Sequence, residues 1–131
     1  MQIADSVERL AYRKERMKTN SFKDLVVWQK SYKLVLEFYE ITNNFPKHEM
    51  YSLVQQIRRA AVSIPSNIAE GYGRQYNKEY KQFLSVAYGS LCELETQYMI
   101  AVELGYSGKE NLLEELMKEV GAMLYRMINP K

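Results

Sequence analysis

Apolar side chains recur at intervals of three and four residues along four long segments of the chain, which is the spacing of an amphipathic helix. Turn residues separate these segments, and the stretches between them are short. The spacing predicts helices over residues 22–43, 47–73, 77–104 and 109–128. Long helices joined by short loops predict an all-α fold, an antiparallel up-down-up-down four-helix bundle.

The second predicted helix contains a proline, Pro65, in its interior. A proline there removes one hydrogen bond and clashes with the carbonyl four residues earlier, at a cost of about 3 kcal/mol. The helix can bend at this point, with Ser63 or Ser66 binding the freed carbonyl, or it can stop and restart. The apolar spacing continues without a break from Met50 to Gly71, which favours a bend.

Small residues indicate where two helices approach each other closely. Gly89 and Ser90 lie in the middle of the third predicted helix, where a glycine costs about 1 kcal/mol relative to alanine. We therefore expect a close backbone contact at this point. Its natural partner is the pair Ala60 and Ala61, or the bend near Pro65.

The first predicted helix carries more apolar residues than one core-facing stripe requires. Two stripes lie side by side on it and make a wide apolar face. A monomeric bundle leaves part of such a face in water, so the excess predicts a subunit interface in a homo-oligomer. One stripe consists of Leu25, Trp28, Tyr32, Val35 and Tyr39, and the other of Val27, Leu34, Phe38 and Ile41.

The chain has 131 residues, the size of one domain, and its formal net charge is only +2. Residues 1–20 contain five basic and three acidic side chains, which account for this excess, so residues 21–131 are neutral. Residues 22–92 have nine basic and six acidic side chains, whereas residues 93–131 have four and seven. A mildly basic half is compatible with phosphate binding, but strongly basic nucleic-acid binders carry far more charge.

The N-terminal segment, residues 1–20, differs from the predicted bundle domain of residues 21–131. It has a few apolar residues at helical spacing, followed by a basic run. One interpretation is an arm appended to a chain that can start at Met17. The other is a short amphipathic helix that packs on a neighbour.

Cys92 is the only cysteine, so no intramolecular disulfide can form. We expect a reduced core thiol in a cytoplasmic protein. No segment is apolar over the length of a membrane span, and the N-terminus lacks the apolar run of a signal peptide. We therefore expect no association with a membrane.

The residues of common catalytic centres are missing. His48 is the only histidine and lies in a predicted loop, so no credible Ser/His/Asp or Cys/His arrangement can be assembled. A di-metal bundle requires Glu-x-x-His pairs on two helices, which one histidine cannot supply. Gly71-x-Gly73 lacks the third glycine and the preceding strand of a dinucleotide site. We expect a protein that is not an enzyme and that uses no metal or cofactor.

A set of basic residues is the candidate for binding nucleic acid, and two tyrosines among them can stack on unpaired bases. Lys78 and Lys81 are three residues apart on one helix face, and Arg74 precedes them by one turn. The alternative is a solvated helix face whose charges pair with Glu70 and Glu79. The full set is Lys30, Lys33, Arg58, Arg59, Arg74, Lys78, Lys81, Tyr72 and Tyr76.

Polar residues gather beside the proline of the second helix, namely Ser63, Ser66, Asn67, Glu70 and Arg74. They form either a binding pocket or a hydrogen-bond network that supports the bend and a subunit contact. We favour the network, because an interrupted helix must find partners for its freed backbone groups. Glu70 and Arg74 are four residues apart, which predicts an ion pair.

Several segments resemble a known family. They are FKDLVVWQKSYKL at residues 22–34, SIPSNIAEG at residues 63–71, Arg74, and FLSVAYGSLCELET at residues 83–96. They resemble the four-helix bundle proteins encoded in intervening sequences of bacterial 23S ribosomal RNA, also called S23 proteins. The resemblance covers about residues 22–128 and implies a bundle that assembles as a ring, a pentamer.

A related branch of that family adds a functional expectation. It is the accessory variability determinant of diversity-generating retroelements, a similar bundle that binds nucleic acid and associates with a reverse transcriptase. The resemblance therefore implies a non-enzymatic oligomer that associates with RNA or DNA as the accessory of a nucleic-acid element. The alternative is a protein-interaction scaffold that does not bind nucleic acid.

Overall fold

The computed structural model describes residues 20–130. These residues form four α-helices and two short 3-10 helices, and no strand occurs in this part of the chain. The predictions for an N-terminal arm or helix and for a start at Met17 lie outside the described residues. In chain order the elements are η1 (Phe22–Asp24), α2 (Val26–Thr42), η2 (Lys47–Glu49), α3 (Leu53–Tyr72), α4 (Asn77–Glu103) and α5 (Asn111–Ile128).

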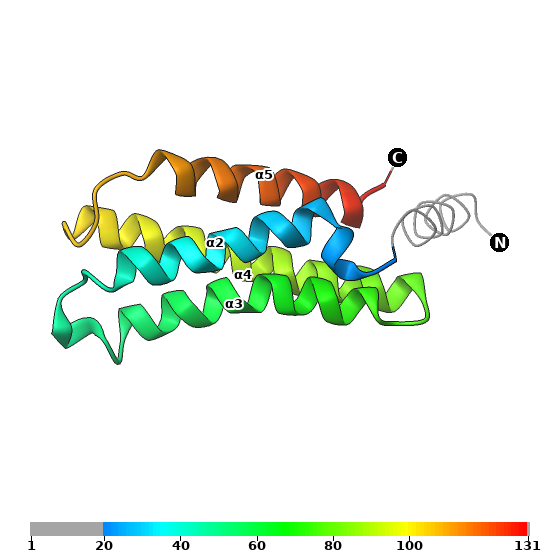
Figure 1. Ribbon diagram of the computed structural model, residues 1–131, viewed down its shortest axis with the longest axis horizontal. Helices are drawn as coiled ribbons and strands as arrows, with labels where there is room; N and C mark the ends of the chain where they lie inside the picture. The colour runs from blue at the N-terminus through cyan, green and yellow to red at the C-terminus, as the bar shows by residue number, and fades with distance from the viewer. Residues whose placement is uncertain (1–19, 131) are drawn as a thin grey trace.

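The four long helices lie side by side, and successive loops join them at opposite ends of the molecule (Figure 1). Helix α2 packs against α3 and α5, and α4 packs against the same two helices. The pairs α2–α3 and α4–α5 therefore form opposite sides of a four-sided bundle. The prediction of an all-α chain with four helices is confirmed for the described residues.

Two of the helices begin later than their apolar spacing predicts. The 3-10 turns Phe22–Asp24 and Lys47–Glu49 occupy the predicted starts, and α2 and α3 begin after them. Before α3, the Glu49 carboxylate accepts hydrogen bonds from the Ser52 hydroxyl and the Leu53 backbone N–H. A side-chain acceptor of this kind satisfies a backbone donor that the first turn of a helix leaves without a partner.

The core lies between the four helices, and in α2 it uses mainly one of the two predicted stripes. Val27, Leu34 and Phe38 are buried. On the other stripe, Tyr32 is 49% exposed and Tyr39 is 40% exposed. A single copy therefore leaves part of the predicted apolar face in water, and the subunit interface stays a prediction.

The stripe predicted for the third helix is buried as expected, but the cysteine is not part of it. Cys92 is exposed, so the prediction of a core thiol is wrong. Each residue of a helix is turned by about 100° from the last, and Cys92 directly follows the buried Leu91. The buried positions of α4 that the spacing predicts are Tyr80, Leu84, Ala87, Leu91, Leu94, Tyr98 and Ala101.

Helix α3 runs without interruption from Leu53 to Tyr72 with Pro65 buried inside it, so the alternative of a stop and restart is wrong. The Asn67 side-chain amide donates to the Ser63 carbonyl oxygen at 2.8 Å and to the Ser63 hydroxyl at 2.9 Å. Asn67, and neither of the predicted serines, is therefore the side chain that binds a backbone carbonyl in this turn.

Of the two glycines, Gly71 and not Gly89 lies close to the neighbouring helix. A Cβ atom on Gly71 would lie 2.7 Å from the Phe83 Cβ, whereas one on Gly89 would have nothing within 4 Å. The predicted close contact at Gly89 is therefore wrong, because this glycine lies on the exposed side of α4. Its neighbour Ser90 does meet α3, since its hydroxyl hydrogen-bonds to the Ser63 hydroxyl at 2.8 Å.

We predict that Gly71→Ala destabilises the protein by roughly 1–3 kcal/mol, the usual cost of forcing an extra methyl group into a packed contact. The neighbouring Phe83 Cβ belongs to a helix and cannot yield without moving α4. Denaturant unfolding of both proteins measures the difference in the free energy of unfolding. The matched control is Gly89→Ala, which should stabilise the protein by about 1 kcal/mol because alanine favours the helix. Equal stability of the two variants would contradict this account.

A second contact ties together the two loops at the opposite end of the bundle. The Tyr106 hydroxyl donates to the Glu49 carboxylate at 2.8 Å, and His48 lies 3.9 Å from the same carboxylate. Hydrogen bonds from Ser52 and then from Tyr106 lower the pKa of Glu49. The bond to the carboxylate raises the pKa of Tyr106. The ionised form of Glu49 therefore contributes to the stability of this end.

We predict that Tyr106→Phe lowers stability at neutral pH and that this difference shrinks on acidification. The native pKa of Glu49 is lowered, so its contribution is complete above the unfolded pKa of about 4.3. The contribution disappears as the pH falls through the lower native value. Denaturant unfolding of both proteins at pH 7 and at pH 3 measures the stability difference at each pH. Tyr51→Phe is the control, because Tyr51 is 89% exposed, and a difference independent of pH would argue against the Glu49 bond.

Candidate nucleic-acid interface

Part of the basic set lies around the short turn between α3 and α4. Gly73 is the C-terminal cap of α3, and Tyr76 is the N-terminal cap of α4. The Tyr76 backbone is extended, and no side chain caps the first turn of α4. The Gly71 contact packs the last turn of α3 against Tyr80 and Phe83 of α4. The turn therefore joins two helix ends that lie against each other.

Two residues of this turn region are held by neighbouring side chains. The Arg74 guanidinium donates to the Glu70 carboxylate at 3.2 Å, as predicted, and lies 4.8 Å from the centre of the Phe83 ring. The Tyr72 ring meets the Tyr80 ring edge-on, with 6.4 Å between their centroids. Arg74 thus keeps a defined direction at the surface, although its charge is already shared with the Glu70 carboxylate.

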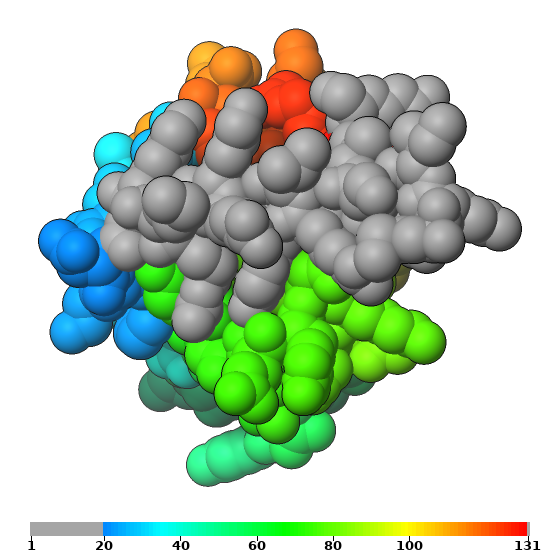
Figure 2. Space-filling model, turned by 90° about the vertical axis from the view of Figure 1, so that its right-hand side faces the viewer, coloured from blue at the N-terminus to red at the C-terminus, as the bar shows by residue number. Residues whose placement is uncertain are grey.

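The other basic and aromatic residues near this turn reach into solvent to different extents. Tyr76 is 65% exposed, Lys78 is exposed and Lys81 is half-buried. Figure 2 views the molecule from this end, and the green side chains of the turn project toward the viewer beside the blue start of the described chain. We call Arg74, Tyr76, Lys78 and Lys81 the turn cluster.

The remaining basic residues do not join the turn cluster. Lys30 forms an ion pair with Glu119 of α5 at 3.0 Å. Arg59 lies on α3 near its start, 15 residues before Arg74, which is about 22 Å along a helix. Lys33 is exposed on α2. The structure therefore divides the predicted set into separate regions.

Arg58 has a structural task at the end of α2. Its guanidinium donates to the Thr42 hydroxyl and to the Asn43 side-chain oxygen, both at 3.0 Å. It also donates to the Tyr39 carbonyl oxygen and lies 4.5 Å from the centre of the Tyr39 ring. Arg58 thus binds a carbonyl in the last turn of α2, where helices leave such groups without partners.

The polar residues beside Pro65 form two small groups. Asn67 donates to Ser63 within α3, and the Ser63 hydroxyl bonds to Ser90 of α4. Glu70 and Arg74 form a separate surface ion pair one turn later. Ser66 is exposed. These contacts support the structural interpretation of the polar residues as a network between helices.

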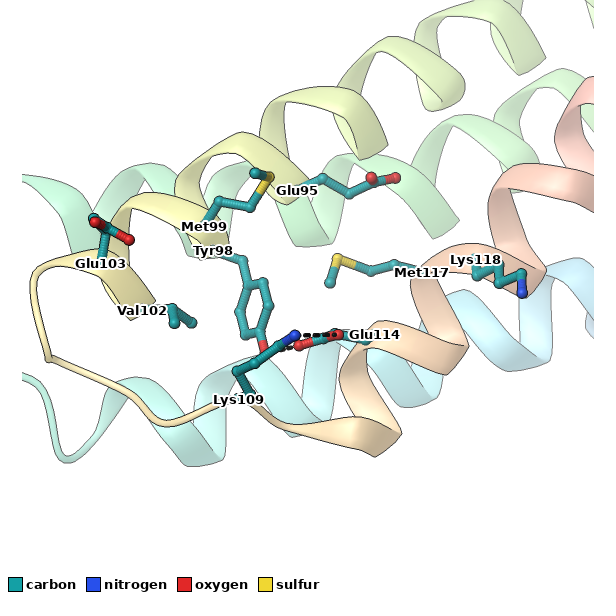
Figure 3. A pocket seen from close by; sticks show the side chains of 9 residues that line it. All are labelled: Glu95, Tyr98, Met99, Val102, Glu103, Lys109, Glu114, Met117 and Lys118. Atoms are coloured by element: carbon teal, nitrogen blue, oxygen red, sulfur yellow. Dashed lines mark hydrogen bonds and ion pairs between the residues drawn. The ribbon is translucent and has the colours of Figure 1, made fainter.

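A groove of about 520 Å³ that the sequence did not predict lies between α4 and α5 (Figure 3). In its wall, the Tyr98 hydroxyl donates to the Glu114 carboxylate at 2.8 Å and accepts from the Glu110 backbone N–H. Burial raises the pKa of Tyr98, and it also raises the pKa of Glu95. The groove is lined by Glu95, Tyr98, Met99, Val102, Glu103, Lys109, Glu114, Met117 and Lys118.

The described residues show no sign of a metal centre or a membrane span. No group of three or more His, Cys, Asp or Glu side chains within residues 20–130 is placed to hold a metal ion. Likewise, none of the helices in that range is long and apolar enough to cross a bilayer. His48 lies in the loop between α2 and α3, as predicted, beside Glu49 and Tyr106.

Comparisons with known proteins add a family and a fold. A family model described as "23S rRNA-intervening sequence protein" matches residues 23–126. The chain is similar to the crystal structure of a protein with unknown function from the S23 ribosomal protein family of Bacteroides thetaiotaomicron, with a TM-score of 0.68 and 22% sequence identity. That match covers 79% of this chain and 98% of the other, and at this identity it shows the fold alone. A comparison with curated proteins finds no match.

Proposed function

The chain belongs to the family of 23S rRNA-intervening sequence proteins, and from this premise we propose that it is a non-enzymatic, homo-oligomeric bundle that binds RNA or DNA through its turn cluster. In this proposal the bundle is antiparallel, up-down-up-down, with α3 bent at Pro65. Copies assemble in the cytoplasm as a ring, a pentamer. The protein acts as the accessory of a nucleic-acid element, for which a reverse transcriptase is one candidate partner.

The observation that carries the nucleic-acid proposal is the exposure of Tyr76 between two basic residues on one short turn. Tyr76 is 65% exposed, with Arg74 two residues before it and Lys78 two residues after it. An aromatic ring stacks on an unpaired base, and basic side chains on either side contact the phosphates of the same strand. This combination supports single-stranded nucleic acid, or the loops of structured RNA, as the ligand.

The start of α4 adds to the attraction for phosphate. The first turn of a helix has backbone N–H groups without partners in the helix and a partial positive charge. In α4 no side-chain cap occupies these donors, and Lys78 and Lys81 lie in the first two turns. Glu70 and Glu79 lower the net charge of this end, so a single copy binds weakly. A ring multiplies the site, and linked sites bind one strand more tightly than each alone.

We predict micromolar binding to single-stranded DNA and to structured RNA at low salt, with a steep loss as the salt concentration rises. Each phosphate contact on a single strand contributes about 0.7 to the slope of log affinity against log salt. The double variant Lys78→Glu with Lys81→Glu should therefore reduce that slope by about 1.4. Fluorescence anisotropy across a salt series measures it. Absence of binding by the unaltered protein at low salt would refute the proposal.

Two sets of control variants are needed. One distinguishes the effect of the turn cluster from the effect of net charge, and the other distinguishes stacking by the Tyr76 aromatic ring from the contribution of the basic side chains. Lys33→Glu with Lys47→Glu makes the same change in net charge at exposed positions away from the turn cluster and should leave the slope unchanged. Tyr76→Phe keeps the aromatic ring and should bind like the unaltered protein. Tyr76→Ala should lose roughly 1–3 kcal/mol, the usual contribution of one stacked base.

A second candidate, a protein-interaction scaffold, is favoured by large apolar side chains at the surface. Exposed apolar residues occur on α2, α4 and α5, among them Leu36 at 55%, Met99 at 68% and Tyr125 at 59%. If the protein is only a scaffold, the double lysine variant will retain its oligomeric state and every phenotype. Recovery of nucleic acid without a protein partner in a pull-down would argue against the scaffold.

A further inference from the structure

Two exposed faces of different chemistry lie on opposite sides of the bundle. The first, which we call the α2–α3 face, contains a hollow of about 600 Å³. The hollow is lined by Tyr39, Met50, Tyr51, Val54, Gln55, Arg58, Arg59, Val62 and Ser63. The second is the α4–α5 groove, with its apolar floor of Met99, Val102 and Met117. The helices pack in the order α2, α3, α4, α5 around the core, so these two faces point away from each other.

The charges of the two faces are complementary. The α2–α3 face is lined by two arginines and by no carboxylate. The α4–α5 groove is lined by Glu95, Glu103 and Glu114, with two lysines. Lys109 lies 3.9 Å from Glu114, so part of the positive charge in the groove is already used. The groove thus retains unpaired negative charge, and the other face offers positive charge.

Within residues 20–130, Arg59 on the α2–α3 face has no hydrogen-bond or ion-pair partner, and the same is true of Glu95, Glu103 and Lys118 in the groove, of which Glu95 lies nearest the middle of α4. Arg59 is exposed on α3, and no hydrogen bond or ion pair reaches it within residues 20–130. The same holds for Glu95 in that part of the chain, although burial raises its pKa. A carboxylate that is partly removed from water gains most from a cation that arrives from outside.

These two charges also lie at the same height along the bundle. Ser63 of α3 hydrogen-bonds to Ser90 of α4, and Gly71 meets Phe83, so residue numbers rise along α3 where they fall along α4. Four residues back from Ser63 is Arg59, and four residues on from Ser90 is position 94, next to Glu95. Copies related by rotation about an axis parallel to the helices bring together residues of equal height.

We propose that the α2–α3 face of one copy docks into the α4–α5 groove of the next copy, with Arg59 against Glu95. This proposal rests on the homo-oligomer of the proposed function and assigns the surfaces that form it. The exposed Tyr51 and Val62 of one copy then cover the apolar floor of the groove in its neighbour. The two surfaces differ, so the contact is head-to-tail and forms a ring when the rotation from one copy to the next closes, whereas a two-fold dimer pairs identical patches.

The test uses charge reversal at the two positions and sedimentation velocity over a concentration series. Arg59→Glu alone and Glu95→Arg alone each place like charges together and should weaken assembly by at least about tenfold. The double variant in one chain restores opposite charges and should recover most of the assembly. An equal mixture of the two single variants should assemble better than either variant alone, because each contact between unlike chains pairs opposite charges and a ring of five needs only one contact between like chains.

The control pair is Lys33→Glu and Glu115→Arg, which change exposed charges outside both surfaces and should assemble like the unaltered protein. Unchanged assembly of both single variants would overturn the docking while leaving the oligomer intact. Weakened assembly of both single variants that the double variant fails to restore would overturn it too. A monomeric unaltered protein would refute the oligomer itself. The salt dependence of nucleic-acid binding is measured separately, so a failure of that function is distinguishable from either result.

Discussion

The close approach of α3 and α4 at Gly71 is the constraint on which the candidate sites depend. A glycine there lets the last turn of α3 reach Phe83 and Tyr80 at the start of α4. This contact keeps the connection between the two helices short and fixes their register, which the bond between Ser63 and Ser90 continues. The turn cluster is built on this junction. The same register places Arg59 of the α2–α3 face and Glu95 of the α4–α5 groove at the same height along the bundle.

The long helices were predictable because their apolar spacing persists over many turns, as Leu84, Leu91 and Leu94 illustrate in α4. Their starts were not, because a 3-10 turn such as Lys47–Glu49 and the first turn of an α-helix present similar patterns over three residues. Gly89 shows a further limit. A glycine reports a missing side chain, but only the packing shows whether that side chain would have met another helix.

The candidate site was predictable only as a collection of residue types. The pair of Glu70 and Arg74 follows from their spacing on one helix, and the structure contains it. The contacts of Lys30 with Glu119 and of Arg58 with Thr42 join different helices, so spacing along one helix cannot reveal them. These contacts decide which charges remain available for a ligand, and they reduce the predicted basic set to the turn cluster and scattered surface positions.

The assembly proposal and the nucleic-acid proposal strengthen each other through geometry. If copies are related by rotation about an axis parallel to the helices, every turn between α3 and α4 lies at the same end of the ring. The modest charge of one turn cluster, where Glu70 offsets Arg74, is then repeated around a single rim. A strand that follows this rim meets successive copies of Tyr76, Lys78 and Lys81 without having to cross the bundle. In such a ring, a near-neutral chain presents a continuous basic and aromatic track, because symmetry gathers at one rim what each copy holds only in part.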